Sequence, residues 1–389
     1  ARKKLLELSD KFGLPIDPDT LVTNLSVSEK QRLEILKTLY RDCKLLILDE
    51  PTAALTPQET DTLFSTIKQM VKEGLSVILI SHKLNEILSV SDKIVVLRNG
   101  RMVGEVLTVE ANRTKLAEMI VGGTVEYPQK EISNRGAEVI KFQDISCNPI
   151  NESSKGLNEV SFRLYEGQIF GIAGVTGNGQ LPLAKMMAGH LTPTKGEIYY
   201  KESKVTSHNP RNFMSLGIAY VPEDRNTDGL VGDMSVWENA VITETEDSRL
   251  RTPLGWLNRE NCKIVAETLC KTYDVRTQSL QQPARLLSGG NVQKLLLGRW
   301  LTRKPKLLIA CQPTRGLDEG AIASIQKIIL SVRQEGNAVL LITEDLDELL
   351  MLSDRIAVIY NGNLSKSYSV EELDRTRIGL MMAGEEFND

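Results

Sequence analysis

Short apolar runs, each followed at once by polar residues, recur along this chain. The run 44–48 (KLLIL) is mostly bulky and apolar without alternation, and Asp49 and Glu50 follow it directly. Such a run predicts a strand buried on both faces of a parallel sheet. Because α/β proteins bind ligands at the carboxyl ends of parallel strands, the two acids are expected at a ligand site. One would suit Mg²⁺ and the other an attacking water; the alternative is a turn-capping Asp49 beside an exposed Glu50.

Helical patterns alternate with the apolar runs. Ser26 and Glu29 form a capping box, which predicts a helix that begins at Ser26. Residues 56–59 (TPQE) form a second capping box with proline at the first helical position, so a helix is expected from there to about Lys72, stopping at Gly74. A second buried strand is predicted at 75–80, and further strands are predicted at 93–97, 218–221, 307–310, 338–342 and 356–359.

An internal repeat sets the architecture. Residues 45–52 (LLILDEPT) match residues 307–314 (LLIACQPT) at a shift of 262 positions. The same shift takes Ser26 to Ser288, His82 to Glu344, Asp92 to Asp354 and Arg113-Thr114 to Arg375-Thr376. A gapless match of this length indicates that the chain contains one fold twice, and the first copy is expected to lack its beginning.

A histidine and a glycine-rich loop are further candidates for the functional site. His82 follows the strand 75–80 at the same sheet edge as Asp49 and Glu50, which makes it a candidate site residue, although a lone histidine is more often structural. In the second copy, residues 174–179 (GVTGNG) follow an apolar stretch and have the spacing of a phosphate-binding loop. The candidate nucleotide-binding residues of this loop are Gly174, Gly177, Asn178, Gly179 and Gln180.

Length and charge limit the remaining possibilities. A chain of 389 residues has room for two domains, expected at 1–123 and 138–389 with a linker at 124–137. The net charge of −4, without a long run of like charge, gives no argument for a nucleic-acid partner. The five scattered cysteines lack metal-site spacing and are expected to be reduced. No apolar run reaches the roughly 20 residues of a membrane span, and the missing initial Met suggests a fragment.

Several segments together resemble one family. Residues 287–291 (LSGGN) with Gln293 and Lys294 are similar to the signature of ABC ATPases, and residues 45–52 to the Walker B strand with its catalytic Glu. His82 matches the switch histidine, residues 54–56 the D-loop with Thr56 in place of the usual Asp, and Glu223 the usual place of the Q-loop glutamine. The chain is therefore identified as resembling the ATP-binding subunit of an ABC importer with two cassettes in one polypeptide. Within the sugar and nucleoside uptake group, segments 25–32 and 220–225 favour the nucleoside (basic membrane protein) branch.

This resemblance implies an α/β fold of P-loop NTPase cassettes. Each would have a parallel core sheet with helices on both faces, a helical subdomain and an antiparallel β subdomain. ATP and Mg²⁺ would be the cofactors. The implied partners are multi-span permease subunits and, indirectly, an extracytoplasmic substrate-binding protein, with the chain at the cytoplasmic face of the plasma membrane. A non-transport ABC ATPase and a regulatory nucleotide-binding scaffold are the alternatives.

The resemblance also implies two unequal ATP sites in a head-to-tail sandwich of cassettes. In the first site, Asp49 would hold Mg²⁺, Glu50 would polarise water and His82 would contact the γ-phosphate. The second copy's signature residues would close this site: Ser288, Gly289, Gly290 and Asn291. The second site would include Ser26 and Glu223. Its replacements of family residues are Gln180, Leu181, Cys311, Gln312, Glu344, Val27 and Ser28. We therefore expect one hydrolytic site, one weak or static site, and negligible ATPase activity from residues 1–389 alone.

Overall fold

The computed structural model describes residues 2–387 except 26, 42, 53, 54, 56, 82, 99, 124–127, 129, 132–134, 152, 153, 245, 246 and 386. The chain forms two compact units, Ala1–Val125 (unit 1) and Glu126–Asp389 (unit 2). Among the described residues, no helix combines the length and apolar character needed to cross a membrane.

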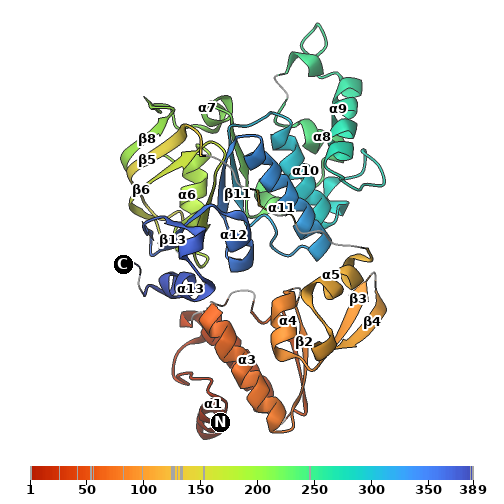
Figure 1. The fold of residues 1–389 in the computed structure, drawn as a ribbon, viewed down its shortest axis with the longest axis vertical. Coiled ribbons are helices and arrows are strands. Elements are labelled where there is room, and N and C mark those ends of the chain that lie inside the picture. The colour runs from red at the N-terminus through yellow and green to blue at the C-terminus, as the bar shows by residue number, and fades with distance from the viewer. Residues whose placement is uncertain are drawn as a thin grey trace. The chain divides into compact units, whose positions relative to one another are not determined.

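Unit 2 is built on a mixed sheet with the strand order β10-β11-β12-β7-β13-β14, in which β15 also pairs with β13 (Figure 1). The five long strands run parallel: β7 (Ile169–Ala173), β10 (Ile218–Val221), β11 (Leu307–Cys311), β12 (Ala338–Ile342) and β13 (Arg355–Tyr360). The short strands β14 (Asn363–Leu364) and β15 (Tyr368–Ser369) are antiparallel to β13. Every residue of β7, β11 and β12 is buried, which confirms the parallel-core prediction for this copy.

Different layers cover the two faces of this sheet. One face packs on α8 (Val236–Val241), α9 (Arg259–Thr272), α10 (Gly289–Leu301) and α11 (Glu319–Gln334). The other packs on α6 (Gln180–Met187) and on an antiparallel sheet of β6 (Leu157–Tyr165), β5 (Glu138–Cys147), β8 (Lys195–Tyr200) and β9 (Ser203–Lys204). The remaining helices are α7 (Pro210–Ser215), α12 (Leu346–Leu352) and α13 (Arg375–Ala383). The predicted helical and antiparallel β subdomains are both present.

Unit 1 repeats a part of unit 2 element by element. Its helices are α1 (Arg2–Phe12), α2 (Val27–Leu39), α3 (Pro57–Lys72), α4 (Leu84–Val90) and α5 (Arg113–Val121). Its strands are β1 (Leu45–Asp49), β2 (Ser76–Ile80), β3 (Lys93–Arg98) and β4 (Arg101–Leu107); β1 and β2 are parallel, β3 and β4 antiparallel. Apart from α1 and β4, each element begins and ends 262 positions before an element of unit 2. The repeat read from the sequence is therefore also a repeat of structure.

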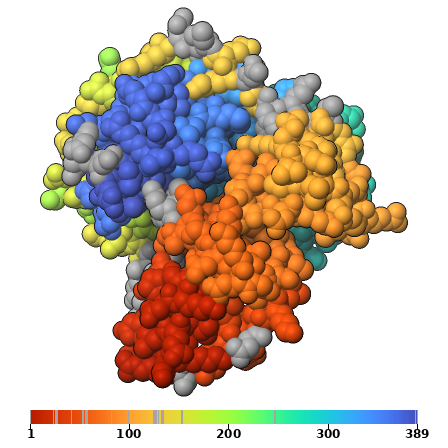
Figure 2. All heavy atoms as spheres, turned by 60° about the horizontal axis from the view of Figure 1, so that its bottom comes forward, coloured from red at the N-terminus to blue at the C-terminus, as the bar shows by residue number. Residues whose placement is uncertain are grey.

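The sheet of unit 1 differs from the prediction in its burial. Its inner side packs on α1, α2 and α3, and Figure 2 shows the red atoms of α1 adjoining the orange-red atoms of the helices that follow. On its other side Leu45 and Ile47 are 48% and 59% exposed, whereas the equivalent Leu307 and Ile309 are fully buried. The prediction that residues 44–48 and 75–80 are buried on both faces is thus wrong here. In unit 2 that face is covered by α6 and the antiparallel sheet, and the described part of unit 1 has no such layer.

A buried ion pair holds several segments of unit 2 together. Arg333 of α11, whose side chain is 3% exposed, donates to both carboxylate oxygens of Asp354 at 2.9 and 2.8 Å. Asp354 also accepts the backbone N–H of Ile169 at 2.8 Å, and the guanidinium group of Arg333 donates to the carbonyl of Glu131 at 2.8 Å. Through these contacts the ion pair holds four segments together: α11, the start of β7, the residue before β13 and the segment that precedes β5.

Candidate functional site

The two predicted acids lie at the end of strand β1. Asp49 is its last residue and stands opposite Ile80 of β2. The N–H of Glu50 donates to the carbonyl of Ile80 at 2.9 Å, and Glu50 has a φ of 46°. This left-handed conformation is uncommon for a residue other than glycine and often occurs at functional sites. The chain thus turns sharply at Glu50, immediately after the strand that carries Asp49.

Gln312 reproduces this turn in unit 2. Its φ is also 46°, and its N–H donates to the carbonyl of Ile342 at 2.7 Å. Cys311, at the position of Asp49, is buried, and burial raises the pKa of its thiol above the usual range. A thiol that stays protonated is a poor ligand for a hard cation such as Mg²⁺. The second copy therefore keeps the backbone of the acidic turn without its chemistry.

Of the two acids at this turn, Asp49 is the predicted Mg²⁺ ligand. Among the described residues, no cluster of three or more His, Cys, Asp or Glu side chains could hold a metal ion. Mg²⁺ usually keeps several waters and binds through one or two carboxylates together with phosphate oxygens. One carboxylate at a strand end fits that donor set, provided that the phosphates of a nucleotide supply further ligands.

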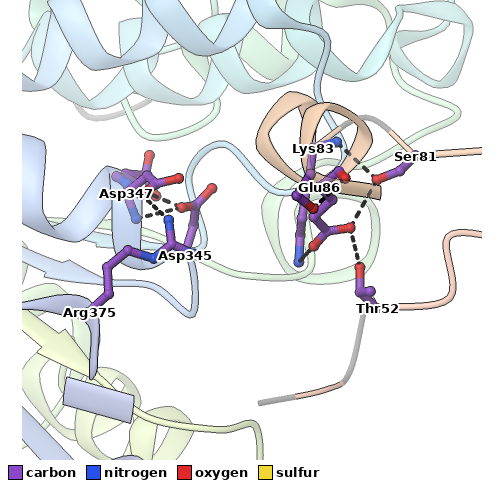
Figure 3. Close-up of polar contacts among 9 residues, drawn as sticks. Thr52, Ser81, Lys83, Glu86, Asp345, Asp347 and Arg375 are labelled. Carbon is purple, nitrogen blue, oxygen red and sulfur yellow. Dashed lines mark hydrogen bonds and ion pairs between the residues drawn. The ribbon is translucent and has the colours of Figure 1, made fainter. Parts of the chain in front are cut away.

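A network of polar side chains lies beside the acidic turn (Figure 3). Glu86 of α4 accepts a hydrogen bond from the hydroxyl of Thr52 at 2.7 Å and from the hydroxyl of Ser81 at 3.3 Å. The ammonium group of Lys83 lies 3.3 Å from the other oxygen of Glu86. The predicted site residues Ser26 and His82 lie outside the described residues. The sequence analysis did not single out Glu86, although the 262-residue shift takes it to a second glutamate, Glu348.

Glu348 has different surroundings in unit 2. Its carboxyl group is buried, and burial and then the charge of Asp345 raise its pKa to about 8. The hydroxyl groups of Thr343 and Thr314 lower this pKa by less, and neither makes a well-aligned hydrogen bond to it. Asp345, at the position of Lys83, caps α12 by accepting the N–H groups of Asp347 and Glu348. At neutral pH Glu348 is therefore mostly protonated.

Replacing Glu348 with glutamine should make the stability of the protein less sensitive to pH. An acid whose pKa is raised in the folded state holds its proton after the unfolded chain has lost it, so stability falls as pH rises from the ordinary value of 4.5 towards 8. Between about pH 5.5 and 7, wild type should lose about 2 kcal/mol more than Glu348→Gln. Urea unfolding at several pH values measures this difference, and parallel pH profiles would contradict the prediction.

The predicted phosphate loop connects β7 to α6. Gly177 and Gly179 have φ values of 94° and 119°. A Cβ atom at Gly174 would lie 2.8 Å from the carbonyl oxygen of Ile359, so the close approach of the backbone requires glycine there. Asn178 and Gln180 point back to the loop, since the side-chain amides of both donate to the carbonyl of Val175, at 3.0 and 2.8 Å. In this structure these two side chains bind the loop itself.

Glu344 also binds this loop. Its carboxylate accepts the backbone N–H of Thr176 at 2.6 Å and, in addition, the Thr176 hydroxyl. The backbone N–H of Glu344 in turn donates to the side-chain oxygen of Gln312 at 3.3 Å. Backbone N–H groups of such loops are the donors that normally bind phosphate oxygens. Thr176 was not predicted from the sequence, because no local pattern indicates a contact across 168 residues.

The predicted signature residues open helix α10. Ser288 is its N-cap, and the amide of Asn291 donates to the Ser288 hydroxyl at 2.8 Å. A Cβ atom at Gly290 would lie 2.7 Å from Cβ of Ala321, so glycine allows α10 to pack against α11. The free N–H groups at the start of a helix can bind an anion. At this helix start, the guanidinium group of Arg225 donates to the carbonyl of Gly289 at 3.4 Å.

Glu223 follows strand β10 and forms an ion pair with Arg315. Burial raises the pKa of its carboxyl group although the guanidinium group of Arg315 lowers it, and the charge of Glu344 adds to the increase. The carboxylates of Glu223 and Glu344 are therefore close enough to repel each other. Its predicted role in nucleotide binding stays a prediction.

Comparisons with known proteins agree with this description. A family model described as "ABC transporter" matches residues 1–53 and 157–315. The chain is 43% identical to a glucose import ATP-binding protein of Haloferax volcanii, over 98% of this chain and 70% of the relative. It is 40% identical to a nucleoside import ATP-binding protein of Lactococcus lactis subsp. cremoris, over 100% of this chain and 77% of the relative. It is also 40% identical to a guanosine import ATP-binding protein of Bacillus subtilis, over 99% and 75%.

Two solved structures support the fold alone. A nucleotide-free ATP-binding cassette from an ABC transporter has a TM-score of 0.52 at 24% identity, covering 63% of this chain and 95% of that chain. An archaeal ribosome recycling factor, in complex with a ribosomal stalk protein, has a TM-score of 0.67 at 20% identity, covering 95% and 69%.

Proposed function

Because this chain belongs to the ATP-binding subunits of ABC importers for sugars and nucleosides, we propose that its two cassettes divide their roles between one hydrolytic and one closed site. Its family hydrolyses ATP to drive import. In this proposal, Asp49 holds Mg²⁺ beside the nucleotide phosphates, and Glu50 polarises the attacking water. His82 contacts the γ-phosphate. The signature residues Ser288, Gly289, Gly290 and Asn291 complete this consensus site in the assembled transporter.

One observation carries the division of roles: the carboxylate of Glu344 accepts the N–H of Thr176 in the second copy's phosphate loop. A negative charge at this position repels a phosphate group and uses a donor that the phosphate would need. Gln180, Cys311 and Gln312 stand where a phosphate-binding Lys, a metal-binding Asp and a catalytic Glu would be expected. We infer that the second site, which would include Ser26 and Glu223, holds nucleotide weakly or not at all.

The proposal extends to partners and place of action. The imported substrate is a nucleoside or a simple sugar, as the names of the three relatives suggest. The chain acts with multi-span permease subunits at the cytoplasmic face of the membrane, and a substrate-binding protein delivers the substrate on the opposite side. The sequence of residues 1–389 contains one glycine loop with phosphate-binding spacing after a strand, residues 174–179 of the second copy. We therefore propose that this polypeptide hydrolyses little ATP by itself.

Replacing Glu344 with alanine should open the second copy's loop to nucleotide. The 389-residue polypeptide should bind a fluorescent ATP analogue at least about tenfold more tightly after Glu344→Ala, because a charge beside the phosphates is lost and the Thr176 N–H is released. Asp347→Asn is the matched control: it also removes a negative charge, but Asp347 pairs with Arg375 (Figure 3). Tight binding by wild type, or equal binding by wild type and Glu344→Ala, would refute the closed second site.

A further inference from the structure

One carboxylate in unit 1 joins the two segments that carry the proposed catalytic residues. Glu86 is the third residue of α4, and its side chain is 12% exposed. One of its oxygens accepts hydrogen bonds from Thr52, which lies two residues after Glu50, and from Ser81, which directly follows β2. Lys83 forms an ion pair with the other oxygen, as the dashed lines of Figure 3 show.

These contacts restrain both segments where they leave the sheet. Thr52 is 1% exposed, so its hydroxyl is removed from water and Glu86 is its hydrogen-bond acceptor. The hydroxyl of Ser81 also accepts the N–H of Lys83 at 3.1 Å, so Ser81 and Lys83 are held to each other as well as to Glu86. Residues that hold reacting groups through such contacts affect rate, because small displacements of a reacting group slow the chemical step strongly.

The second copy supplies an internal comparison. Thr314, Thr343 and Glu348 occupy the positions of Thr52, Ser81 and Glu86, but Asp345 stands where Lys83 stands in unit 1. Glu348 has no ammonium partner at that position and makes no well-aligned hydrogen bond to either hydroxyl. The charged arrangement therefore occurs in the copy that carries Asp49 and Glu50.

We propose that Glu86 is a positioning residue for ATP hydrolysis, which holds the turn that carries Glu50 in its working arrangement through Thr52 and fixes that turn to the end of strand β2 through Ser81. The inference rests on the proposed function, because it assigns hydrolysis to the first copy. In this role Glu86 acts through the two hydroxyl groups and does not itself touch the nucleotide, and its ion pair with Lys83 orients its carboxylate.

Steady-state ATPase kinetics of the full-length protein in its assembled transporter test this role. Glu86→Gln should lower kcat about tenfold and leave the KM for ATP within about twofold, because the substitution disturbs the chemical step more than binding. Thr52→Val removes the hydroxyl at nearly constant volume and should have the same effect, whereas Thr52→Ser keeps the hydroxyl and should restore kcat. The same substitutions at the equivalent positions, Glu348→Gln and Thr314→Val, should leave kcat unchanged.

Equal losses of kcat from Glu86→Gln and Glu348→Gln, or a loss in Glu86→Gln that appears in KM alone, would overturn the positioning role. If Glu86→Gln does not fold, Thr52→Val against Thr52→Ser gives the same decision. Inactivity of Glu50→Gln with full activity of both Glu86→Gln and Thr52→Val would refute this inference while the proposed function stands. Full activity of Glu50→Gln would refute the proposed function itself.

Discussion

Replacing Glu50 with glutamine is expected to lower ATP hydrolysis and ATP-driven uptake by about 10³-fold. Loss of a general base typically lowers the rate by roughly 10²–10⁴-fold, and glutamine keeps the size of the side chain without its charge. The measurement is ATPase activity and uptake of labelled nucleoside or sugar by the full-length protein in its assembled transporter. Nucleotide binding should persist, because phosphoryl transfer and not binding depends on this carboxylate.

The internal repeat supplies the matched control for Glu50. Gln312 lies 262 positions later, with the same backbone conformation and the same hydrogen bond to the neighbouring strand. Gln312→Ala should leave ATPase activity within about twofold, because this copy has no carboxylate at the turn. Unchanged activity of Glu50→Gln, or a comparable loss in Gln312→Ala, would show that hydrolysis is not assigned to the first copy.

Asp354→Ala is expected to destabilise unit 2 by about 4 kcal/mol. The substitution leaves the guanidinium group of Arg333 buried without its counter-charge, and breaking a buried pair in this way typically costs about 3–5 kcal/mol. It also removes the acceptor of the Ile169 N–H at the start of the central strand β7. Urea unfolding of the 389-residue polypeptide, followed by a signal from unit 2 such as Trp300 fluorescence, measures the loss.

Asp92→Ala is the matched control for Asp354. Asp92 is the equivalent residue of unit 1, but it is exposed, and Val71 stands at the position of Arg333. This substitution should therefore change stability by less than about 0.5 kcal/mol, as is usual for surface positions. A loss of less than about 1 kcal/mol for Asp354→Ala would mean that the Arg333 pair is not a major support of unit 2.

Most of the fold could be predicted from the sequence, because its signals are local. The helix Pro57–Lys72 follows from a capping box at one end and from Gly74 at the other, and Gly74 has the expected positive φ of 93°. The buried strands of unit 2 follow from unbroken apolar runs. The burial of β1 and β2 was predicted wrongly, because an apolar run records which side chains could be buried and not which neighbouring layers are present.

The candidate site was predictable in its motifs but not in its contacts. Asp49 and Glu50 stand at a strand end, and Gly174 to Gly179 form a loop, as their patterns indicated. The contact between Thr176 and Glu344 and the network of Glu86 depend on side chains distant in sequence that the fold brings together. Only the 262-residue shift gives an early indication of Glu86, since it pairs Thr52 and Glu86 with Thr314 and Glu348.

The common φ of Glu50 and Gln312 bears on how the two copies diverged. Both residues keep the same unfavourable main-chain turn, although only one of them carries a carboxylate. The side chains at this turn differ between the copies while the φ value is the same, so the second copy is not a structurally degraded form of the first. If the two copies divide their roles as proposed, hydrolysis at the second copy would require new side chains at a few positions and no change of the main chain between strand and turn.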